Sequence, residues 1–109
     1  MDSTMVHGLL RIIANKIEAK PMEYTAYADM LNVAKEAMRT NEEEAVVWLR
    51  WLGQKCAEII PRVVENDVVM ARKYMTLHKQ VLLTNAPHDF DSFLLYICLL
   101  YTSPSPRDS

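Results

Sequence analysis

The chain has 109 residues and a formal net charge of −2; half of its residues are hydrophobic, and only two are glycine. This composition suits a packed helical domain rather than a disordered chain, and it lacks the strongly basic footprint of many nucleic-acid-binding domains. A chain of this length forms one small domain or the first part of a larger one.

Two amphipathic helices are expected in the first forty residues. The first begins after Ser3 or Thr4, either of which can cap it, and ends near Lys20. Its apolar stripe consists of Val6, Leu9, Leu10, Ile13 and Ile17. Pro21 suits the first turn of a second helix, which continues to Arg39. The stripe of that second helix consists of Tyr24, Tyr27, Leu31, Ala34 and Met38.

A third helix has the strongest start signal. Thr40 and Glu43 form a capping-box pattern, in which each side chain satisfies a free backbone donor. The glutamates at positions 42–44 also suit the positive end of the helix dipole, with an acidic docking surface as the alternative interpretation. Pro61 ends or kinks this helix. Its apolar face consists of Val46, Leu49, Leu52, Cys56, Ile59 and Ile60.

Two more helices follow. Asn66 or Asp67 can cap the fourth, and the residues at 84–87 break it. Its expected stripe consists of Val68, Ala71, Met75, His78 and Leu82. A fifth helix begins at Asp89. Since no segment alternates like a strand, the expected fold class is all-α, with about five helices in a small bundle that is truncated in or after the last one.

The composition changes abruptly after Ile97, in the stretch CLLYTSPSPRDS. Because proline cannot continue a helix, a disordered C-terminal tail is one interpretation. Codons chosen for Cys98 through Asp108 can also match a transposon-type adapter used to build sequencing libraries. We therefore expect residues 98–109 to be adapter-derived rather than native, and we expect the natural protein to be longer.

Single reactive side chains have structural explanations. Cys56 lies within an aliphatic stripe, which predicts a buried, inert thiol rather than a nucleophile. His7 and His78 have no second metal ligand at helical spacing, so we expect them at the surface or its boundary. Trp48 and Trp51 flank the apolar face of the third helix, and at least one of them is expected to be partly exposed.

The stretch at residues 88–91, His-Asp-Phe-Asp, resembles a metal or acid–base cluster in composition. Neighbouring positions at a helix start point in different directions, which favours a structural explanation. Asp89 would cap the helix, and Phe90 would lie in the core with Phe93 or Leu94. We therefore expect no catalytic, cofactor-binding or metal-ligating residues in this chain.

Residues 23–39, EYTAYADMLNVAKEAMR, weakly resemble a helix-turn-helix. Asn32 would lie in the turn, and residues 34–39 would form the recognition helix. The acidic run at 42–44 follows directly and would repel phosphates. One uninterrupted helix explains the same residues and is the favoured interpretation.

The compartment is indicated by two features. Cys56 is the only cysteine before Cys98, so no internal disulfide is expected in the native part, which favours a reducing, intracellular setting. The chain shows no signal-peptide pattern, and its longest apolar run is too short to span a bilayer. We expect a soluble protein with no membrane partner.

The segment that begins at Arg72 and ends at Ile97, RKYMTLHKQVLLTNAPHDFDSFLLYI, resembles the region near the start of phage terminase large subunits. That family has a Lys-Tyr-x-x-x-x-Lys helix that leads into an aromatic-rich helix. The residues that match its helix are Lys73, Tyr74 and Lys79. The match continues through Leu82, Leu83 and residues 86–91.

The resemblance implies a domain organisation and a function. Residues 1–66 would be a helical N-terminal extension, and residues 67–97 would begin a terminase-like region ahead of an ATPase core. The parent would translocate DNA with ATP and Mg²⁺ and cleave the concatemer, in the cytoplasm of an infected bacterium. No GxxxxGK[ST] motif occurs here, so this part is expected to be non-catalytic.

The expected partners are the ATPase domain of the parent, the terminase small subunit or the portal, and DNA through the parent. The alternative function is a stand-alone helical interaction module or a helix-turn-helix-like DNA-binding module of phage or bacterial origin.

Overall fold

Four helices joined by short turns form most of the protein. The computed structural model describes residues 3–91 and 93–95, with side chains from Met5 onward. The helices are α1 (Ser3–Ala19), α2 (Tyr24–Thr40), α3 (Glu42–Val64) and α4 (Val68–Asn85). A fifth, short helical segment covers residues 90–91 and 93–95. No strand occurs in these ranges, which confirms the all-α prediction; the predicted tail at 98–109 lies outside them.

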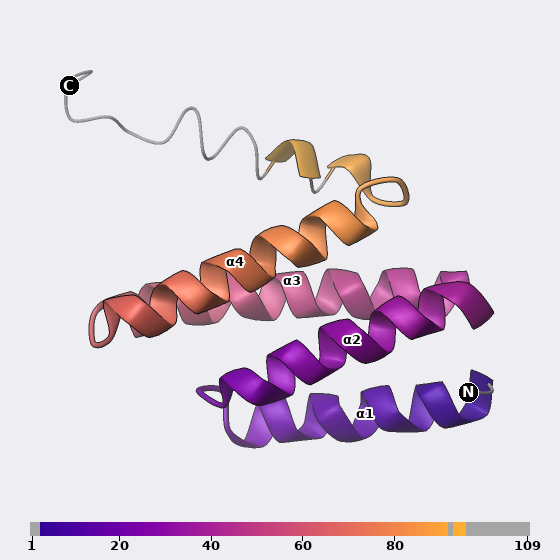
Figure 1. The fold of residues 1–109 in the computed structure, drawn as a ribbon, viewed down its shortest axis with the longest axis horizontal. Helices are drawn as coiled ribbons and strands as arrows, with labels where there is room; N and C mark the ends of the chain where they lie inside the picture. The colour runs from indigo at the N-terminus through magenta and orange to yellow at the C-terminus, as the bar shows by residue number, and fades with distance from the viewer. Residues whose placement is uncertain (1–2, 92, 96–109) are drawn as a thin grey trace.

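The helices form two antiparallel hairpins, α1 with α2 and α3 with α4 (Figure 1). The two first members, α1 and α3, run in the same direction. Near their starts His7 pairs with Glu44, and farther along Glu18 pairs with Lys55 at 3.2 Å. Helix α2 contacts α1, α3 and α4, so it connects the two hairpins.

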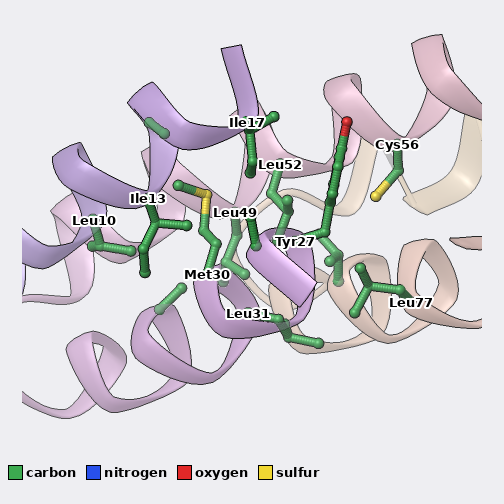
Figure 2. Packing of buried hydrophobic residues seen from close by; sticks show 14 of the residues in the cluster. Leu10, Ile13, Ile17, Tyr27, Met30, Leu31, Leu49, Leu52, Cys56 and Leu77 are labelled. Atoms are coloured by element: carbon green, nitrogen blue, oxygen red, sulfur yellow. The ribbon is translucent and has the colours of Figure 1, made fainter. Parts of the chain in front are cut away.

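One hydrophobic core is shared by all four helices and includes residues on both sides of position 66. Figure 2 shows side chains from these helices converging on it. Each fully buried aliphatic or aromatic side chain contributes about 1.5–3 kcal/mol relative to an exposed one. The largest fully buried side chains are Tyr27, Tyr74, Leu10, Ile17, Met30, Leu49, Leu52, Val81 and Cys56.

A tyrosine cluster joins α2 to α4. The Tyr74 ring meets Tyr24 edge to face at 5.2 Å and Tyr27 at 5.1 Å. The Tyr27 hydroxyl donates a hydrogen bond to the carbonyl oxygen of Pro21 at 2.7 Å. Pro21 lies in the turn before α2, which begins at Tyr24. The prediction that Pro21 belongs to the first helical turn is therefore wrong.

The start of α3 differs by one residue from the predicted capping box. Asn41 is the cap: its side-chain oxygen accepts a bond from the backbone N–H of Glu44 at 3.2 Å, and its amide donates to the Glu44 carboxylate at 3.3 Å. Thr40 is still the last residue of α2 and donates to the carbonyl of Ala37. Because the single residue Asn41 joins α2 to α3, Asn41 rather than Thr40 occupies the cap position of α3.

The other helix ends agree with the predictions in part. Ser3 and Thr4 both lie within α1 rather than before it. Asp67 caps α4, because its carboxylate accepts from the backbone N–H of Met70 at 3.1 Å. Pro61 does not end α3, which continues to Val64. Proline has no N–H to donate to the carbonyl oxygen four residues earlier. That carbonyl belongs to an exposed residue of the helix.

The buried face of α4 is rotated from the predicted stripe. Of the predicted residues only Ala71 is buried, whereas Val68 and Met75 are exposed. The buried residues are Ala71, Tyr74, Leu77, Val81 and Asn85. This helix has apolar side chains around most of its circumference, so its contacts with α2 and α3 decide which ones are covered.

The other predicted stripes are closer to the observed faces. In α1 Leu9 is exposed while Ala14 is buried. In α2 Met30 is fully buried, although it was not predicted, and in α3 Val46 and Ile60 are only partly buried. Helix α2 is uninterrupted at Asn32, which confirms the single-helix interpretation of residues 23–39 and leaves no helix-turn-helix there. Among the described helices, none has the length and apolar character needed to cross a bilayer.

Candidate functional site

A groove of about 220 Å³ lies between α3 and α4. Its floor consists of buried residues, and its rim consists of exposed or partly buried side chains. The lining residues are Leu49, Arg50, Gly53, Gln54, Ala57, His78, Val81, Leu82, Asn85, Asp89 and Leu95. The groove therefore combines an aliphatic floor with several polar groups, which is typical of ligand-binding pockets.

Gly53 forms part of the groove floor in the middle of α3. A Cβ atom placed at this position would come no closer than 3.7 Å to the nearest atom, Cγ1 of Val81, and 4.0 Å to Nε2 of His78. Such distances are ordinary van der Waals contacts, so alanine would fit. Glycine in a helix interior costs about 0.5–1 kcal/mol relative to alanine, and here it leaves the floor without a side chain.

Asn85 is the buried polar residue of the groove, with 3% of its surface exposed. Its side-chain amide donates to the carbonyl oxygen of Val46 at 3.5 Å, which sets the orientation of the amide. The other side-chain atom, Oδ1, has no hydrogen-bond partner among the described residues. Leaving a buried acceptor unsatisfied costs about 1–3 kcal/mol, so this oxygen favours any donor that can reach it.

His78 also belongs to α4 and lines the groove. Its side chain is partly buried, in agreement with the prediction that it lies at the surface or its boundary. Burial lowers the pKa of its imidazole, because the charged form is desolvated in this position. The side chain is therefore neutral near pH 7 and adds no charge to the groove.

An ion pair stands at the end of the groove. Nε of Arg50 in α3 contacts Oδ2 of Asp89 at 2.9 Å, and the two charges neutralise one another. Next to it in the sequence, Nε2 of His88 lies 3.1 Å from a carboxylate oxygen of Glu42, at the start of α3. The two pairs attach the chain that follows α4 to α3.

Residues 88 and 89 contact two different residues of α3. Asp89 immediately precedes the short helical segment, and its backbone carbonyl accepts from the backbone N–H of Phe93 at 3.3 Å, while its carboxylate contacts Arg50. The side chains of His88 and Asp89 are directed to different partners rather than toward a shared ion. No group of metal-ligating side chains occurs in the described part of the chain.

Phe90 and Leu94 are not in the core, so that prediction is wrong. Phe90 is 58% exposed, Leu94 43% and Leu95 63%. We call these three residues the C-terminal apolar cluster. Phe93 is partly buried, with its ring centroid 6.3 Å from that of Phe90. The described residues do not cover the cluster.

The remaining candidate side chains have structural roles. Cys56 is fully buried, which confirms the prediction of a buried thiol, and burial raises the pKa of this thiol to about 12. His7 is exposed and pairs with Glu44, whose carboxylate also accepts from the indole N–H of Trp48 at 3.2 Å. Trp48 and Trp51 are both partly buried and meet at 5.8 Å, as expected for shoulder positions.

Sequence reasoning did not identify the groove. Asn85 was interpreted as part of a helix break, and Arg50 and Gly53 were not singled out. A glycine in the middle of a strongly apolar helix is the one local signal that could have indicated a site. The partners Val46 and Asp89 are distant in sequence, so only the fold brings them together.

Comparisons with models of known protein families, with curated proteins and with solved structures found no match to this chain.

Proposed function

We propose that the chain is a non-catalytic helical interaction module at the N-terminal end of a phage terminase large subunit. The observation that supports the interaction role is the exposure of the C-terminal apolar cluster. Its helical periodicity indicates a buried position, yet the described residues leave its side chains open to solvent. Contiguous exposed apolar side chains mark surfaces that contact another protein surface, a membrane or a ligand.

The cluster is presented on an anchored segment. Arg50 binds Asp89 just before Phe90, and Glu42 binds His88. Both contacts are partly solvent-exposed, so each contributes only modestly to stability, but together they define where the segment lies. A partner would therefore meet apolar side chains that already have a set position.

The proposed occupant is the part of the parent polypeptide that follows this region. In the terminase interpretation this part is the ATPase core, and ATP, Mg²⁺ and the nuclease metal ions belong to it. The support is the resemblance of residues 72–97, which include most of α4 and the cluster. The small subunit or the portal and DNA would then be partners of the assembled parent in the infected cell.

The test is to recover the gene downstream of the Ile97 codon and to express the longer protein. We expect the reading frame to reach a GxxxxGK[ST] motif, and we expect hydrogen exchange at residues 90–95 to be slower in the longer protein than in the present chain. Exchange at the exposed face of α1 around Met5 and Ile12 should be unchanged and serves as the control. An early stop codon would reject the terminase assignment, and unchanged exchange at 90–95 would reject the covered surface.

A further inference from the structure

We propose that the groove between α3 and α4 is a binding site for a small, neutral, planar aromatic molecule that carries an N–H or O–H donor. The proposal rests on three features of the groove: its volume, the unsatisfied oxygen of Asn85, and the missing side chain at Gly53. It does not depend on the proposed terminase function.

The volume and the floor suit one aromatic ring system. The groove holds about 220 Å³, whereas a cavity of about 150 Å³ accommodates benzene in a well-studied protein. Leu49 and Val81 are buried beneath it, and Leu82 and Leu95 complete its apolar surface. A flat bicyclic ring would therefore have aliphatic contacts on the floor and along the sides.

The polar groups specify a donor on that ring. The amide of Asn85 is oriented by the carbonyl of Val46, so Oδ1 is the atom that remains to be satisfied. An N–H or O–H group is the partner that an amide oxygen accepts. Because burial keeps His78 neutral and Arg50 is paired with Asp89, the groove offers no unbalanced charge to an ionic ligand.

Gly53 keeps the floor open. Alanine would fit at this position and would favour the helix, so the glycine is not required by backbone strain or by a clash. A larger side chain at 53 would project toward Val81 and His78, across the groove. The position thus offers a direct way to block the site.

The experiment uses indole and 1-methylindole as probes in an NMR titration of the full chain. The two molecules have nearly the same shape, but methylation removes the N–H donor. We expect indole to shift the amide signals of Gly53, Val81 and Asn85 and to bind about tenfold more tightly than 1-methylindole. Asn85→Ala should remove the difference between the probes, because the acceptor is absent.

Two glycine variants provide the matched comparison. Gly53→Leu should abolish indole binding, whereas Gly8→Leu, at a position in α1 with open space around it, should leave binding unchanged. Equal binding of the two probes, shifts that map to residues away from the groove, or no saturable shift would each overturn the proposal. If Gly53→Leu does not fold by circular dichroism, the comparison of the two probes on the unaltered chain still decides the outcome.

Discussion

Tyr27 in α2 and Tyr74 in α4 meet edge to face, with ring centroids 5.1 Å apart and ring planes at 89°. Both side chains are buried, but their hydroxyl groups differ. The Tyr27 hydroxyl donates to the carbonyl oxygen of Pro21, whereas the Tyr74 hydroxyl has no hydrogen-bond partner among the described residues. Burial raises the pKa of Tyr74 to about 12 and raises that of Tyr27 as well, so both are neutral under ordinary conditions.

This difference predicts opposite effects of removing each hydroxyl. Tyr27→Phe should lower the free energy of unfolding by about 1 kcal/mol, because it leaves the Pro21 carbonyl without its donor. Tyr74→Phe should leave stability unchanged or raise it by up to about 1 kcal/mol, because it removes an unsatisfied buried group. Urea denaturation of the two variants measures both values. A loss in Tyr74→Phe as large as that in Tyr27→Phe would contradict the assignment.

The observed cap of α3 makes a second prediction. Asn41→Ala should destabilise the protein by about 1 kcal/mol, since the side chain of Asn41 satisfies the backbone N–H of Glu44. Thr40→Ala is the control and should cost less than about 0.5 kcal/mol, because Thr40 makes only a 3.4 Å contact with the carbonyl of Ala37. Thermal unfolding of both variants separates the two positions. A larger loss at Thr40 would restore the capping box at residues 40 and 43.

His78 predicts a pH dependence with a defined sign. Burial lowers its pKa in the folded protein, so the unfolded chain binds the proton more readily. The contribution of the neutral imidazole is therefore complete above about pH 6.5 and is lost as the pH falls through the lower pKa of the folded state. His78→Gln should lose less stability than the unaltered protein between about pH 7.5 and 5.5.

Chemical denaturation at a series of pH values measures this difference. The other histidines are present in both proteins, so the comparison isolates position 78. Parallel stability curves for the two proteins would show that His78 does not titrate with folding.

Cys56 predicts slow thiol chemistry. Because burial raises its pKa to about 12, the thiolate fraction near pH 8 is roughly a thousandfold lower than for an ordinary exposed cysteine. In a Cys98→Ser protein, iodoacetamide should label Cys56 slowly in buffer and rapidly in urea. Mass spectrometry follows the labelling. Equal rates in the two solvents would mean that the thiol is accessible in the folded state.

Local sequence signals predict where a helix begins, whereas tertiary contacts decide which face of the helix is buried. Asn66 or Asp67 was the predicted cap because both precede an apolar run, and Asp67 caps α4 through a bond to the backbone N–H only three residues later. The α4 stripe was predicted in the wrong rotation. Its apolar residues surround most of the helix, so periodicity alone does not separate Val68 and Met75 from Leu77.

The candidate functional residues also divide into those that the local sequence predicts and those that only the fold brings together. The burial of Cys56 followed from its place in an aliphatic stripe. The groove did not, because it depends on Asn85 reaching the carbonyl of Val46 and on Asp89 reaching Arg50. Each of these contacts joins positions that are far apart in the chain, and no local pattern encodes which of them meet.

The sequence by itself determined the number, type and approximate limits of the helices, because periodicity, caps and prolines act within a few residues. Only the tertiary structure decided which face of α4 is buried and which side chains line the groove. It also decided that Phe90 and Leu94 lie outside the core. Burial depends on which helices pack together, and packing is set by the summed contacts of the whole fold rather than by any one segment.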